Sequence, residues 1–288
     1  MPKYKPLVRT LLILAAAVLL LICACCVLYI YQYYRGITAS SQLGQEADPS
    51  AVSVTVETVR EISPRPDDPD GSEPDASPEP QLRTIQIPVD FDALEAANSD
   101  IYAWIQIPGT VIDYPVVQSP DSDTFYSNHS SDKAYYTGGS IFSQKTYNGR
   151  GFDEPMTLLY GHNLRSGNMF SQLNNFADVV YFDEHREIYI YTPDMVYRYE
   201  IFAAYDHENE HLLANHDFSE PADFDEFFSS VYSDASLYDN FLQDFSPAPG
   251  DRIITLSTCF RQNNRRRYLV QGVLVEVMRV VGHVEPGS

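Results

Sequence analysis

Cysteine is scarce in this chain. Only four of its 288 residues are cysteines, and three of them, Cys23, Cys25 and Cys26, lie within one apolar run. Cys259 is therefore alone in the rest of the sequence and has no partner there for a disulfide bond. An unpaired cysteine is either buried and inert or accessible and reactive. Cys259 is thus a candidate for a reactive thiol.

Basic residues are few beyond the N-terminus. The chain has 19 Lys and Arg against 40 Asp and Glu, and residues 1–35 hold four of the basic residues and none of the acidic ones. The remainder therefore carries a formal net charge of −25. Because a strongly acidic surface repels nucleic acid, we expect no nucleic-acid partner.

Neither a phosphate-binding motif nor a metal site is indicated. The sequence lacks a Gly-rich phosphate-binding loop and a GxSxG motif. His207, His211 and His216 lie in an acidic stretch, where solvated side chains are the ordinary expectation. Scattered acidic residues are also expected in so acidic a chain, so they do not indicate a calcium site. We therefore expect no bound metal ion.

One long apolar run is present. Residues 11–31 read LLILAAAVLLLICACCVLYIY without a charge, which is long enough to cross a bilayer as a helix. A signal peptide would have a shorter apolar middle and a cleavage site, whereas several tyrosines follow here, as at a membrane interface. Lys3, Lys5 and Arg9 precede the run and favour a cytoplasmic N-terminus. We predict a cytoplasmic segment at 1–10, a single-pass transmembrane anchor at 11–31 and an extracellular remainder.

Residues 32–83 have a different composition. Seven of the nineteen prolines fall in residues 36–83, together with many Asp, Glu and Ser residues. Such a stretch cannot bury enough apolar surface to fold, so we predict an extended linker that holds the following domain away from the bilayer. Val52, Val54 and Val56 alternate like a short strand, but this interpretation gives that strand no partner.

From residue 84 onward the pattern is typical of a mostly β domain, which we assign to residues 84–288. Short apolar alternations are separated by Gly, Pro, Asn and Asp. We predict strands at 84–89, 102–107, 111–117, 139–143, 156–161, 187–192, 195–206, 252–258 and 268–277. A short helix is predicted at 91–98. A longer one, beginning after Ser219, would place aromatic residues from Phe224 to Phe241 on a core-facing stripe.

Three side chains that could support cysteine chemistry lie at ends of predicted strands. Cys259 ends the apolar run 253–259, and Arg267 begins the next strand, which a hairpin would bring back beside the thiol. His162 follows the strand 156–161 directly. A cysteine nucleophile needs a proton donor for the leaving group and a cation or N–H for the oxyanion. The sequence alone leaves open a structural role for each of these residues.

These residues belong to a pattern that resembles the class B sortases. The motifs are TLSTC at 255–259, an Arg eight residues later and YGHN at 160–163. The stretch NSDIYAWIQIPGTVIDYPVVQ at 98–118, the GGSIF at 138–142 and IYIYTPDMVYRYEIF at 188–202 look like family blocks in the family's order. The resemblance covers about residues 84–281. Related sequences often have an acidic residue directly after the cysteine, whereas Phe260 stands here.

The resemblance implies a fold, a reaction and a set of site residues. The fold would be an eight-stranded β-barrel with a few helices. Cys259 would be the nucleophile, His162 the general acid and base, and Arg267 the oxyanion or substrate clamp. Supporting positions would be Asn128, Tyr160, Ser257 and Thr258. The enzyme would cleave a C-terminal sorting signal after Thr and transfer the surface protein to an amine of a peptidoglycan precursor or a pilin, without a cofactor.

Other functions use similar residues. Papain-like peptidases place the cysteine before the histidine in the chain, which is the reverse of the order here. The L,D-transpeptidases have His and Gly just before the cysteine, where this chain has Ser257 and Thr258. A non-catalytic, membrane-tethered binding or adhesion module with a buried thiol is the alternative from a different functional class.

Overall fold

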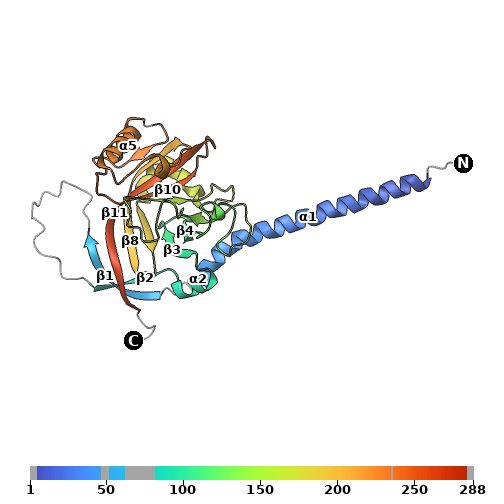
Figure 1. Cartoon of the computed structure of the whole chain (residues 1–288), viewed down its shortest axis with the longest axis horizontal. Helices are drawn as coiled ribbons and strands as arrows, with labels where there is room; N and C mark the ends of the chain where they lie inside the picture. Colours follow the sequence, from blue (N-terminus) through green and yellow to red (C-terminus); the bar gives the residue numbers. More distant parts are fainter. Residues whose placement is uncertain (1–4, 47–51, 62–81, 235, 284–288) are drawn as a thin grey trace, which may run out of the picture.

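The structure, a computed structural model, describes residues 5–46, 52–61, 82–234 and 236–283 (Figure 1). Eight strands close a barrel in the order β11-β10-β6-β5-β4-β3-β7-β8, because β8 also pairs with β11. The expected eight-stranded barrel is therefore confirmed. Its strands are β3 (Ile101–Gln106), β4 (Asp113–Val117), β5 (Ile141–Phe142), β6 (Met156–Tyr160), β7 (Glu187–Tyr191), β8 (Met195–Glu208), β10 (Ile253–Cys259) and β11 (Arg266–His283).

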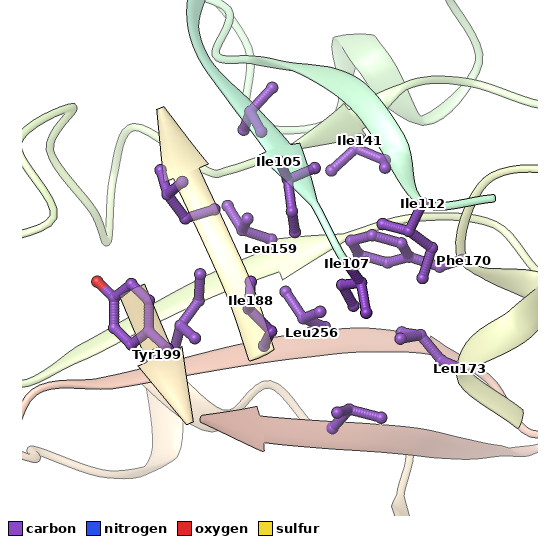
Figure 2. Packing of buried hydrophobic residues seen from close by; sticks show 14 of the residues in the cluster. Ile105, Ile107, Ile112, Ile141, Leu159, Phe170, Leu173, Ile188, Tyr199 and Leu256 are labelled. Carbon is purple, nitrogen blue, oxygen red and sulfur yellow. The ribbon is translucent and has the colours of Figure 1, made fainter. Parts of the chain in front are cut away.

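Apolar side chains fill the barrel from alternate positions of each strand. Figure 2 shows Leu159, Ile188 and Leu256, from three different strands, pointing into the same interior. All three are fully buried. Successive residues of a strand point to opposite faces, so Ile253 of β10 lies in a second cluster outside the barrel. β10 is thus buried on both faces, which explains why it reads as a continuous apolar run.

Helix α5 (Pro221–Ser233) covers that outer face. Phe224, Phe227, Phe228 and Val231 are buried against side chains of β8, β10 and β11. The predicted helix is present, but it begins after Glu220 and ends at Ser233. The aromatic residues beyond it leave the helix, and Phe241 lies in β9 (Asn240–Phe241), which pairs with β8. Their spacing matched a helix only by coincidence.

Two further strands extend the sheet beyond the barrel. β1 (Val52–Glu61) pairs with the C-terminal half of β11, and β2 (Leu82–Ile87) pairs with β1. Val54 and Val56 of β1 are fully buried. The prediction that residues 32–83 form an unfolded linker is therefore wrong for 32–46, which continue α1, and for 52–61 and 82–83, which form strands. The valines of β1 complete an apolar cluster beside the barrel. Residues 62–81 lie outside the described part of the chain.

A buried carboxylate ties this hairpin to the barrel. Glu276 of β11 is almost fully buried and accepts hydrogen bonds from Arg83 of β2 and from Arg198 of β8, the latter at 3.1 Å. A buried charge is tolerated when it is paired in this way. β2 and β8 are thereby joined through one side chain of β11.

The N-terminal helix leaves the barrel as a single long rod (Figure 1). It is α1 (Lys5–Glu46), and its stretch Arg9–Gln32 is long and apolar enough to cross a membrane. The remaining described helical segments are short. They are α2 (Phe91–Ala97), η1 (Phe125–Ser127), η2 (Phe170–Ala177), α3 (Val179–Glu184) and α4 (Leu212–Asn215).

Candidate active site

Cys259 is the last residue of β10, between β6 and β11. β10 runs parallel to β6 and antiparallel to β11, and in the second pairing Cys259 lies directly opposite Arg267. The preceding Thr258 is fully buried, whereas Cys259 is partly exposed. The thiol therefore lies where the buried part of the strand ends and a cavity begins.

Arg267 faces the thiol without a carboxylate partner. Its Nη1 lies 3.8 Å from the Cys259 Sγ, and its Nε donates a hydrogen bond of 2.7 Å to the Oδ1 of Asn209. Among the described residues no Asp or Glu forms an ion pair with Arg267, whereas the neighbouring Arg266 pairs with Asp206. An amide oxygen orients a guanidinium without neutralising its charge. The cation next to the sulfur thus keeps its full charge.

His162 lies in the same cavity. It follows β6 by two residues, and its Nε2 lies 2.7 Å from the backbone carbonyl oxygen of Ser127. Because a carbonyl can only accept, this contact places a proton on Nε2 and leaves Nδ1 as the nitrogen that can exchange one. The cavity has a volume of about 390 Å³, and its walls include Tyr160, His162, Asn209, Glu210, Cys259 and Arg267.

Two asparagines fix the backbone that follows the cysteine. The Nδ2 atoms of Asn163 and Asn174 donate to the Cys259 carbonyl at 3.0 Å and 3.2 Å. Asn174 also accepts a hydrogen bond of 2.7 Å from the backbone N–H of Arg261. Phe260 is buried and stacks on Tyr268. The residue in the position where related sequences often have an acid therefore packs into the core here.

The four supporting positions differ in their surroundings. Tyr160 lines the cavity, and burial raises its pKa to about 12, although Arg267 acts in the opposite direction. Its phenol is therefore protonated at neutral pH. Ser257 and Thr258 are buried immediately before the cysteine, and Asn128 is exposed and is not among the residues that line the cavity.

Other lining residues were not predicted from the sequence. They include Thr124, Ser127, Phe142, Gln144, Asn209 and Glu210. Ser127 contributes a backbone carbonyl, which any residue type could supply, so its role leaves no sequence signal. Asn209 lies two residues beyond His207, which pairs with Arg267 in the β8–β11 register. A correct prediction of the pairing between β8 and β11 would have placed Asn209 close to Arg267.

The segment HENEH at 207–211 has the HExxH spacing of many zinc enzymes but not their geometry. In those enzymes one helix places both histidines on the same face, whereas here β8 ends at Glu208 and α4 begins only at Leu212. His207 faces Glu210 at 3.6 Å, and the His211 Nε2 lies 2.5 Å from the Gln144 side-chain oxygen. In the described part of the chain no group of three or more His, Cys, Asp or Glu could hold a metal ion.

Known proteins resemble this chain in sequence. The sortase domain family matches residues 105–275. The curated sortase B of Listeria monocytogenes is 34% identical over 185 residues, which cover 63% of this chain and 72% of the relative. The sortase B of Staphylococcus aureus is 28% identical over 169 residues, covering 59% and 67%.

Solved structures agree with these matches. A Bacillus anthracis protein described as similar to sortase B superposes with a TM-score of 0.61 at 25% identity, covering 85% of this chain and 97% of that one. The Clostridium perfringens sortase B superposes with a TM-score of 0.57 at 28% identity, covering 65% and 100%. The chain therefore belongs to the sortase family, which is a family of cysteine transpeptidases. Within that family it is a class B sortase.

Proposed function

We propose that this sortase is anchored in the cell membrane by α1 and acts on the outer face of a Gram-positive cell. It would cleave a C-terminal sorting signal after Thr and join the released surface protein to an amine. The observation that carries the proposal is the position of the Cys259 Sγ. It lies 3.8 Å from the Arg267 guanidinium, which has no carboxylate partner among the described residues. Both groups lie at the wall of a cavity that His162 also lines. A nearby cation favours the thiolate, which is the nucleophilic form of cysteine.

The first half of the proposed reaction breaks the peptide bond. The Cys259 thiolate attacks the carbonyl carbon of the Thr residue, and the carbonyl oxygen becomes an oxyanion that faces Arg267. His162 then gives a proton to the leaving nitrogen through Nδ1, while Nε2 stays bonded to the Ser127 carbonyl. The products are an amine and a thioester between Thr and Cys259.

The second half forms the new bond. An incoming amine attacks the thioester carbonyl and loses a proton to His162, and the tetrahedral oxyanion again faces Arg267. Collapse releases the Cys259 thiolate and leaves an amide between the surface protein and the acceptor. The acceptor would be an amine of a peptidoglycan precursor or of a pilin. No cofactor takes part in either half.

A peptide library tests this function directly. Purified full-length protein in detergent would be mixed with peptides that end in varied sorting motifs, and adducts would be detected by intact-mass spectrometry. We expect a thioacyl adduct on Cys259 whose mass corresponds to cleavage after Thr. Loss of the adduct on addition of a small amine would demonstrate transfer. An unmodified Cys259 across the library, and also after a methanethiosulfonate reagent, would instead indicate a buried thiol in a binding module.

The hydrogen bond from Arg267 to Asn209 supplies a second test. Asn209→Asp would place a carboxylate against the guanidinium and form an ion pair, which draws charge away from the thiolate and the oxyanion. An exposed ion pair is worth up to about 1 kcal/mol, so we expect kcat/KM to fall about fivefold. Alkylation of Cys259 by iodoacetamide at fixed pH should slow in parallel.

Asn209→Ala is the matched control because it removes the same hydrogen bond without adding charge. Its alkylation rate should stay closer to that of the wild type than the rate of Asn209→Asp does. Equal alkylation rates for all three proteins would contradict an electrostatic role for this contact.

A further inference from the structure

Where it leaves its apolar stretch, helix α1 contacts a loop of the catalytic domain. Tyr29 and Gln32 of α1 line one small pocket together with Tyr135, Tyr136 and Thr137, which belong to the loop between η1 and β5. One turn further along the helix, the Arg35 guanidinium pairs with Asp132 of the same loop at 3.2 Å. We call residues 132–137 the membrane-side loop.

The order of these contacts sets the depth of the loop. The apolar stretch ends at Gln32, so Tyr29 lies within its last turn and Arg35 lies just outside. A helix rises about 1.5 Å per residue, so Tyr29 would sit near the boundary of the hydrocarbon layer, where tyrosine is typically found. Residues that share a pocket with Tyr29 and Gln32 lie at a similar depth. The contacts therefore place residues 135–137 at the level of the lipid headgroups.

The chemistry of the loop suits that environment, although the domain as a whole is acidic. Tyr135 is 55% exposed, and an exposed tyrosine combines an apolar ring with a polar hydroxyl. The two carboxylates near the loop are both paired, Asp132 with Arg35 and Asp100 with Lys133 at 3.0 Å. Neither of these two carboxylates is therefore left unpaired, and an unpaired one would be repelled by a phospholipid surface.

We propose that the membrane-side loop rests on the outer surface of the phospholipid bilayer, with the Tyr135 ring among the headgroups. The proposal rests on the membrane anchor proposed above and adds a second contact with the bilayer, made by the catalytic domain itself. The anchor and the domain then form one unit whose height above the membrane is set by side-chain contacts.

The loop also connects this contact to the active site. Ser127, whose carbonyl binds His162, lies five residues before Asp132. The intervening chain is held by backbone hydrogen bonds of 2.9 Å from Tyr136 to Asn128 and from Ser130 to Ala134. Ser130 and Ser131 are fully buried. The cavity would thus stay close to the bilayer, which favours substrates that are themselves still attached to the membrane.

Lipid quenching of a fluorescent label tests the proposal. The full chain would carry alanine at Cys23, Cys25, Cys26 and Cys259 and one new cysteine, labelled with bimane and reconstituted in nanodiscs. Nanodiscs with a spin label on the lipid headgroup would be compared with unlabelled ones. Tyr135→Cys and the neighbouring Thr137→Cys should each lose at least about half of their fluorescence. The matched control Leu237→Cys is 98% exposed and lies between α5 and β9, so it should lose none.

A label at Tyr29→Cys distinguishes failure of the loop proposal from failure of the membrane anchor. Quenching at residue 29 without quenching at 135 and 137 would overturn the loop proposal and leave the anchor intact. Absence of quenching at all three positions would overturn the anchor as well. Equal quenching at 135, 137 and 237 would indicate nonspecific association of the domain with lipid and would also overturn the proposal.

Discussion

Cys259→Ala is expected to abolish both cleavage of a sorting peptide and formation of the thioacyl adduct. Without the sulfur there is no atom to carry the acyl group, and loss of a nucleophile of this kind lowers kcat by about 10⁴-fold or more. The fold should tolerate the change because Cys259 is only partly buried at the end of β10. We expect the free energy of unfolding to change by less than about 1 kcal/mol. Peptide cleavage followed by chromatography and thermal unfolding measure the two quantities.

Arg267→Lys makes an informative companion to that variant. Lysine keeps the positive charge but lacks the planar group that contacts the Cys259 Sγ and Asn209 at the same time. We expect it to retain the acyl adduct at a reduced rate, whereas Cys259→Ala forms none. Cleavage that survives in Cys259→Ala would refute the nucleophile assignment.

Val54→Asp is expected to destabilise the β-barrel domain strongly. Val54 is fully buried in β1, in the cluster that also contains Ile87 and Met278. An unpaired carboxylate in that position must be desolvated or protonated, which costs about 3–5 kcal/mol. Urea unfolding followed by tyrosine fluorescence should show a large decrease in the midpoint concentration.

Val59→Asp is the matched control because it makes the same substitution on the same strand. Val59 is 47% exposed, so its replacement should change the free energy of unfolding by no more than about 0.5 kcal/mol. Similar midpoints for Val54→Asp and the wild type would mean that β1 does not pack on the sheet in solution.

Most of the barrel strands could be predicted because their period-two pattern is local. The strands predicted at 102–107, 156–161 and 187–192 differ from β3, β6 and β7 by a residue or so at their ends. β1 was different, since its valines alternate visibly but its partner in β11 lies more than 200 residues away. Proline-rich flanks then favoured an unfolded segment. The 3-10 helix η2 was not predicted, because so short a helix depends on its tertiary contacts.

The candidate active-site residues could be predicted to lie close together because they stand at strand ends and because a hairpin follows Cys259. Pairing of β10 with β11 brings Cys259 and Arg267 opposite each other, as a hairpin after Cys259 requires. The asparagines that orient the site could not be predicted in this way. Asn174 lies in η2 and Asn209 beyond β8, and neither segment is near Cys259 in the sequence. Only the folded chain reveals such contacts.

The pairing of β1 with β2 changes how the acidic, proline-rich stretch between these two strands is interpreted. Residues 62–81 begin after Glu61 and end before Leu82, and Leu82 pairs with Glu57 only a few residues away from that start. The strands on both sides of this stretch are therefore paired in one sheet, so the stretch does not stand between α1 and the domain in the sequence. Inserting or removing residues there is therefore expected to leave the distance between α1 and the barrel unchanged. Only residues 47–51 join α1 to β1, and five residues span at most about 18 Å.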